Sequence, residues 1–199
     1  MAITEGRNQR NHRLHAAAPV TITVPAARAH GEAIPATRPG PAPYAWAAAR
    51  IAIGWVFLWA FLDKLFGWGF ATPAGKAWIN GGSPTTGFLK GTADHTFGGV
   101  FNTLAGQAWV DWLFMIGLAG IGAALVLGIG MRIAAATGGL LLLMMWAAEL
   151  PLTTNPFMDE HIVYAIVLIG LALAHAGDTL GLGRIWAATP LVRRLPILK

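Results

Sequence analysis

The chain has 199 residues, of which 55% are hydrophobic and 12% are charged, and its formal net charge is +5 at pH 7. A soluble domain carries about 25% charged residues, so this composition is typical of a protein whose main solvent is lipid. Much of the positive charge lies in the two terminal tails, as in juxtamembrane segments, and nucleic-acid binding is not predicted. The sequence contains no cysteine, which excludes disulfides, thiolate catalysis, Cys-ligated zinc and iron–sulfur clusters on this chain.

Residues 1–43 form a basic tail that is rich in Ala and Pro and has no apolar periodicity. We expect this tail to be disordered. It does not read as a secretory signal, because no apolar segment follows its arginines within the tail. Residues 181–199 form a second, shorter basic tail, which leaves residues 44–180 as the predicted membrane domain.

Four stretches of the membrane domain are long enough to cross a bilayer, which takes roughly 20 apolar residues. They are residues 46–66, 109–130, 131–150 and 157–176. The second and third follow one another almost without a linker and predict a tight antiparallel hairpin. Small residues recur in both and predict close approach of helix backbones, among them Gly117, Gly120, Gly122, Gly138 and Gly139. The predicted fold class is all-α: an integral membrane four-helix bundle.

The basic residues near the spans predict the orientation of the bundle. Those on or near the side shared by both termini are Arg28, Arg38, Arg50, Arg132, Arg184, Arg193 and Arg194, and the other side has Lys64, Lys76 and Lys90. The positive-inside rule therefore places both termini in the cytoplasm. The long connection between spans 1 and 2, residues 67–108, is then extracytoplasmic. Its apolar runs are short and interrupted, which favours an interfacial helix or a re-entrant cap.

This topology brings ionisable groups from every span into one layer near the outer membrane face. Such groups are costly near hydrocarbon, so they pair, face the bundle interior or serve a function. The candidate site residues are Lys64, Glu149, Asp159, Glu160 and His161. One reading is a proton-linked pocket in which Glu149 or His161 exchanges protons with a quinol or a polar substrate. The other is a set of charges that locks the bundle.

Asp63 and Lys64 are adjacent, but on a helix they point about 100° apart and must find different partners. Asp63 is expected to meet His161 or a donor in the loop. On the inner side, Arg50, Arg132 and Asp178 are expected to be anchors, with an ion pair between Arg50 and Asp178 that ties the first span to the last.

His161 and His175 are fourteen residues apart and share a helix face, which would suit two stacked haems. Bis-histidine ligation needs two further histidines on a facing span, and the first three spans contain none. Neither haem nor a metal is therefore expected on this chain.

Several segments together resemble the DoxX/DoxD membrane protein family, and in particular the DoxD-like subunits of thiosulfate:quinone oxidoreductase. The segments are "RIAIGWVFLWAFLDKLFG", "NGGSPTTGFL", "DWLFMIGLAGIGAALVLGIGMRIAA", "MMWAAELP", "NPFMDEHIVYAIVLIGLALA" and "GDTLGLGRIW". The resemblance covers the chain from about Tyr44 onward, and Arg50, Gly54 and Lys64 match the family pattern. It implies a four-helix protein of the bacterial plasma membrane that passes electrons from thiosulfate to quinone with a small DoxA-like partner subunit.

Two functions follow as hypotheses. The first is a quinone-linked oxidoreductase subunit, with quinone as electron acceptor and a polar site at the outer face. The second is a non-enzymatic scaffold or accessory protein for a partner enzyme or an envelope complex. In either case the expected partners are the lipid bilayer, a DoxA-like subunit or other membrane-complex proteins, and further copies of the chain. A solute carrier is less favoured, because no inverted repeat and no broken span is visible.

Overall fold

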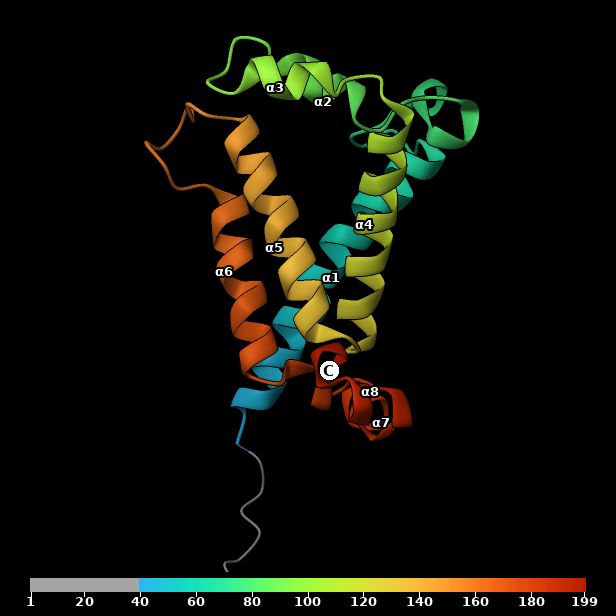
Figure 1. Ribbon diagram of the computed structural model, residues 1–199, viewed down its shortest axis with the longest axis vertical. Coiled ribbons are helices and arrows are strands. Elements are labelled where there is room, and N and C mark those ends of the chain that lie inside the picture. Colours follow the sequence, from blue (N-terminus) through green and yellow to red (C-terminus); the bar gives the residue numbers. More distant parts are fainter. Residues whose placement is uncertain (1–39) are drawn as a thin grey trace, which may run out of the picture. The chain divides into compact units, whose positions relative to one another are not determined.

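The computed structural model describes residues 40–199, and helices are the only regular secondary structure within that range (Figure 1). The all-α prediction is therefore confirmed for the described residues. The prediction of disorder for the N-terminal tail lies outside the described residues up to position 39. At the other end of that tail, helix α1 already begins at Ala42, directly after Pro41, whose fixed φ suits a helix start.

Three helices are long and apolar enough to cross a membrane: α1 (Ala42–Phe66), α4 (Ala108–Leu127) and α5 (Met131–Ala148). Helix α6 (Glu160–Leu173) is also apolar but has 14 residues, which corresponds to about 21 Å. The 3-10 turn η3 (Ala176–Asp178) follows it. Three of the four predicted spans thus correspond to helices of spanning length, and the fourth corresponds to a shorter helix with a turn behind it.

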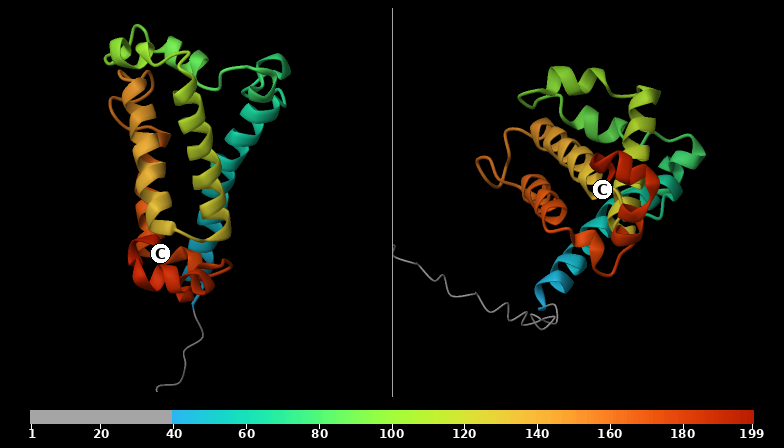
Figure 2. Two further views of the ribbon diagram at one scale, coloured as in Figure 1. Left: turned by 45° about the vertical axis from the view of Figure 1, so that its right-hand side comes forward. Right: turned by 60° about the horizontal axis from the view of Figure 1, so that its bottom comes forward.

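The four helices pack mainly as two pairs, α1 with α4 and α5 with α6, while α4 and α5 are joined through their hairpin (Figures 1 and 2). In the first pair, a Cβ added to Gly122 of α4 would lie 2.7 Å from the backbone nitrogen of Leu58. A Cβ on Gly54 of α1 would lie 2.9 Å from the backbone nitrogen of Val126. The two backbones therefore approach too closely for any side chain at these positions, as was predicted for Gly122 but not for Gly54.

The α4–α5 hairpin depends on a second close approach. Helix α4 ends at Gly128, whose φ of 73° is left-handed. A Cβ at Gly128 would lie 2.9 Å both from the Arg50 guanidinium and from the carbonyl oxygen of Gly177. The hairpin turn is thus packed between α1 and the segment after α6, which fixes the ends of three helices relative to one another.

Residues 67–107, which we call the roof, lie over one end of α4 and α5 (Figures 1 and 2). Their helices are all short: η1 (Ala74–Lys76), η2 (Trp78–Asn80), α2 (Thr86–Gly91) and α3 (Gly98–Thr103). Asp111 in the first turn of α4 fastens the roof. Its Oδ1 accepts hydrogen bonds from Ser83 Oγ at 2.9 Å, from Thr85 Oγ1 at 2.6 Å and from the Thr85 amide at 3.2 Å.

The opposite end, which we call the tail end, carries the helices α7 (Gly183–Ala188), α8 (Pro190–Arg194) and η4 (Pro196–Leu198) (Figure 1). This segment folds back onto the start of α5. The amide of Arg132 donates to the carbonyl of Lys199 at 3.0 Å, and Trp186 Nε1 donates to that of Leu198 at 2.6 Å. Residues 181–199 are therefore packed against the hairpin rather than extended from it.

Candidate functional site

Arg50 is fully buried and joins two segments that are far apart in the sequence. Its Nη1 donates to the carbonyls of Leu125 and Val126, the latter at 2.9 Å. Its Nη2 donates to the carbonyl of Leu180 at 2.8 Å and, more weakly, to that of Thr179 at 3.4 Å. The last carbonyls of a helix have no partner within the helix, and the negative end of its dipole favours a cation. Arg50 therefore caps α4 from the side.

The expected ion pair between Arg50 and Asp178 is not what the structure shows. Within residues 40–199 no carboxylate lies within ion-pair distance of Arg50, and backbone carbonyls take the place of Asp178. Arg132 likewise donates to a carbonyl, that of Pro196, at 3.1 Å. Both arginines are anchors, as predicted, but their acceptors are main-chain oxygens, which a sequence pattern does not identify.

Asp63 and Lys64 face different surroundings. Asp63 is 1% exposed, and its carboxylate accepts hydrogen bonds from the amides of Ala71 at 3.0 Å and Phe70 at 3.3 Å. Of the two partners expected for Asp63, the loop donor is therefore the one present, and His161 is not. No cation pairs with Asp63 among the described residues, so it holds the roof to α1 by hydrogen bonds instead. The side chain of Lys64, in contrast, lines a groove.

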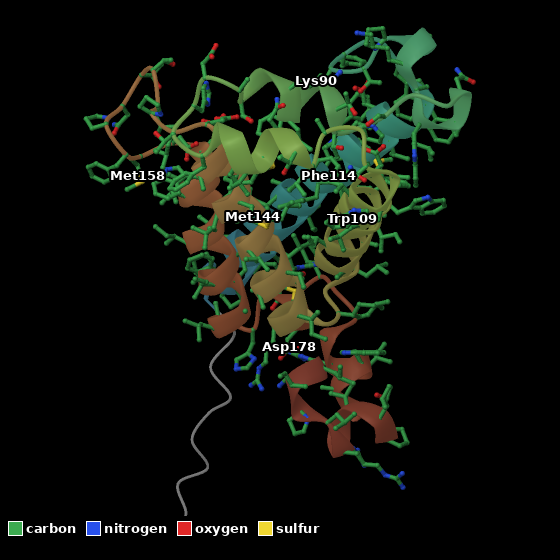
Figure 3. The ribbon with its side chains drawn as sticks, turned by 45° about the horizontal axis from the view of Figure 1, so that its top comes forward. Lys90, Trp109, Phe114, Met144, Met158 and Asp178 are labelled. Atoms are coloured by element: carbon green, nitrogen blue, oxygen red, sulfur yellow. The ribbon has the colours of Figure 1, made fainter. Side chains whose placement is uncertain are left out.

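The groove lies between α4 and α5 beneath the roof and has a volume of about 720 Å³. Its walls are almost entirely apolar. Figure 3 labels Phe114 on α4 and Met144 on α5, which belong to the two facing walls. Lys64 is the single ionisable side chain that lines it in the part of the chain described. The groove therefore combines a long apolar interior with one cation near the roof.

The groove opens sideways onto the apolar surface of the helices. Leu113 and Ile116 of α4 and Leu140 of α5 line it, and each is more than 60% exposed. A Cβ added to Gly117 or Gly120 of α4 would meet nothing within 4 Å. Because these glycines have no side chain, they leave space within the groove. They were predicted to serve helix packing; their place is in the groove instead.

A second group of polar side chains lies where α5 ends and α6 begins. We call Glu149, Asp159 and His161 the Glu–Asp–His cluster. His161 Nδ1 is 2.7 Å from Asp159 Oδ2 and 4.0 Å from Glu149 Oε2. The side chains of His161 and Asp159 are 10% and 8% exposed, and that of Glu149 is 37% exposed. The cluster is thus mostly buried, with Glu149 on its open side.

Both ends of the cluster are held by hydrogen bonds. Asp159 caps α6, because its Oδ1 accepts the amide of Ile162 at 3.2 Å. On the other side of the cluster, the roof forms hydrogen bonds with the backbone before and after Glu149. His95 Nδ1 lies 2.9 Å from the carbonyl of residue 148, and the amide of Thr96 donates to that of residue 150 at 2.8 Å. The role of the roof in fixing Glu149 was not predicted.

The five predicted site residues therefore lie in three different places in the structure. Glu149, Asp159 and His161 come together, Lys64 lines the groove, and Glu160 is exposed on the first turn of α6. No protein-family model, curated protein or solved structure shows a significant match to the chain. The groove and the Glu–Asp–His cluster are the features on which a function can be based.

Proposed function

We propose that the chain is a membrane subunit of a quinone-linked oxidoreductase of the bacterial plasma membrane, and that quinone binds in the groove between α4 and α5. The observation that supports this most directly is the groove itself. A membrane quinone joins a polar ring to a long apolar tail. The groove offers a long apolar interior, a lateral opening and a single lysine near the roof.

In this proposal α1, α4 and α5 cross the membrane, and α6 with η3 forms the fourth span. The exposed faces of all four helices carry large apolar side chains, such as Trp55, Ile116, Leu140 and Ile166. That surface suits contact with acyl chains rather than water. The distribution of basic residues supports a cytoplasmic tail end and places the roof outside.

Lys64 would hold the polar ring. Its ammonium carries three donors and no acceptor, so it can donate to a ring carbonyl oxygen. A hydrogen bond from a charged donor is worth about 1.5–3 kcal/mol. A bound quinone supplies the capacity to accept two electrons and two protons. Lys64 would orient the ring, while the apolar walls exclude water from the tail.

The Glu–Asp–His cluster lies close to the same end of the groove. Met145 lines the groove, and Glu149 follows it by four residues, about 6 Å further along the axis of α5.

The resemblance to DoxD-like proteins supports thiosulfate as the source of electrons and a small DoxA-like subunit as the partner that delivers them.

The experiment that tests quinone binding is photolabelling with an azido-quinone in nanodiscs that contain the purified full chain. We expect the label on peptides of α4 and α5, and at least tenfold less label in Gly117→Leu, whose side chain would fill the groove. Gly87→Leu is the matched control, since Gly87 is also helical, has open space around it and lies outside the groove.

Two results would overturn the proposal. One is equal labelling of wild type and Gly117→Leu. The other is a groove that retains phospholipid which added quinone does not displace, as measured by mass spectrometry of the bound lipid. If labelling occurs as expected, quinone reduction with thiosulfate and a DoxA-like protein then tests the electron source separately.

A further inference from the structure

We infer that Glu149, Asp159 and His161 form a binding site for a divalent transition-metal cation at the roof end of the α5–α6 pair. The inference rests on these three residues and does not depend on quinone in the groove. Glu149 caps the end of α5, Asp159 caps the start of α6 and His161 lies in its first turn, and each offers one ligand atom within 4.8 Å of the other two.

The spacing of the ligand atoms suits a shared cation. Imidazole nitrogen and carboxylate oxygen bind zinc at about 2.0–2.2 Å, so two ligands at tetrahedral or right angles are about 3.0–3.5 Å apart. The distances from His161 Nδ1 to the two carboxylates, 2.7 and 4.0 Å, lie on either side of this range. Glu149 is the side chain that must move inward, and it is the exposed one of the three.

The composition of the cluster also favours binding of a cation. Two carboxylates face one imidazole, and no Lys or Arg lies within ion-pair distance of either carboxylate in residues 40–199. Asp159 is the buried one of the two, and a buried carboxylate is costly unless it is paired, hydrogen-bonded or bound to a metal. The Ile162 amide occupies Asp159 Oδ1, so Oδ2 is left to face His161. The cluster thus places two carboxylates beside a single imidazole, a donor set that suits a divalent ion.

The donor set indicates the class of metal. Calcium and magnesium prefer oxygen ligands alone. One imidazole nitrogen and two carboxylate oxygens suit zinc, manganese or iron(II). Three protein ligands leave coordination positions open, as in catalytic rather than structural zinc sites. The open side is that of Glu149, through which water or a small anion can reach the ion.

The Asp159 side chain and the backbone on both sides of Glu149 are held in place before any metal binds. Asp159 is fixed by its capping bond, and the roof contacts on both sides of Glu149 hold the end of α5. A site of this kind loses little conformational freedom on binding. The neighbours Glu160 and His175 provide matched controls, because one is an exposed carboxylate next to the cluster and the other an exposed histidine outside it.

The test uses the purified full chain in detergent, stripped with chelator and titrated with Co²⁺, which gives visible absorption bands when protein ligands bind it. We expect one Co²⁺ per chain, displaced by Zn²⁺. Glu149→Gln and His161→Gln should weaken binding at least tenfold, while Glu160→Gln and His175→Gln should bind like wild type. Circular dichroism and gel filtration establish that each variant is folded.

Glu149→Gln decides the matter if His161→Gln fails to fold, since the Glu149 side chain is partly exposed and forms no hydrogen bond within residues 40–199. The inference is wrong if wild type binds no more Co²⁺ than a variant that carries both Glu149→Gln and His161→Gln, or if Glu149→Gln alone binds as tightly as wild type. Quinone labelling is measured on the same samples, so that loss of one site is told apart from loss of the other.

Discussion

Replacing Arg50 by Met tests the hydrogen bonds of a fully buried arginine. Arg50 is 0% exposed and donates to the carbonyls of Leu125, Val126 and Leu180, with a weaker bond to Thr179. Met has a similar length but no donor. The substitution therefore leaves the end of α4 and the segment after η3 without their common partner, while the apolar volume is largely kept.

The magnitude follows from the number of acceptors. Each buried carbonyl that loses its partner costs about 1–3 kcal/mol. Three good acceptors give a gross loss of about 3–9 kcal/mol. Removal of the buried cation recovers part of this, since keeping a charge out of water costs several kcal/mol. We expect a net loss of about 3–5 kcal/mol in the free energy of unfolding. Arg50→Lys should fall between wild type and Met, because an ammonium lacks the planar fork that reaches both segments.

The assay is SDS-induced unfolding in mixed micelles, followed by tryptophan fluorescence. Arg132→Met is the control, because Arg132 is exposed and makes one side-chain bond, to Pro196. It should lose less than about 1 kcal/mol. A loss below 1 kcal/mol in Arg50→Met, or equal losses in the two variants, would refute the view that Arg50 ties α4 to the segment after η3.

Three further changes test the roof and the α1–α4 contact, the first two in the same unfolding assay. Asp63→Ala frees two amides of the roof and should cost about 1–3 kcal/mol; a neutral result would show that water replaces the carboxylate. Gly122→Leu forces α1 and α4 apart and should cost more than about 3 kcal/mol, whereas Gly120→Leu, which meets open space, should be tolerated. Asp111→Ala should release the roof, seen as faster hydrogen exchange at the Thr85 amide; unchanged exchange would contradict its fastening role.

The long helices and the hairpin were predictable from the sequence. Long apolar stretches indicate the helices, and glycines at the helix ends indicate the turn between them. Gly128 and Gly130 are both left-handed and mark the turn between α4 and α5, as the near absence of a linker indicated. The fourth span was predicted three residues too early at its start. Asp159 is the reason: its carboxylate caps α6, so the helix begins at Glu160.

The site was predicted only in part. The position of a residue in the sequence indicates how deep it lies along a helix, but it does not indicate which neighbouring helix its side chain faces. Lys64 and Glu149 were placed in one layer, which their positions near the helix ends support. Their neighbours depend on which helices pair, and Lys64 belongs to the α1–α4 pair while Glu149 belongs to α5–α6. The groove escaped prediction for a related reason: Gly117 could equally have served close packing.

The pairing of the helices has a mechanical consequence for the groove. Its two long walls belong to different pairs, α1–α4 and α5–α6, each of which is packed mainly within itself. A change in the distance between the walls would leave the contacts within each pair intact. The hairpin glycines Gly128 and Gly130 form the short covalent link between the two pairs. Any change in the distance between the walls must therefore be taken up by the hairpin at the tail end and by the roof at the other, where Asp111 of α4 and the end of α5 both bond to it.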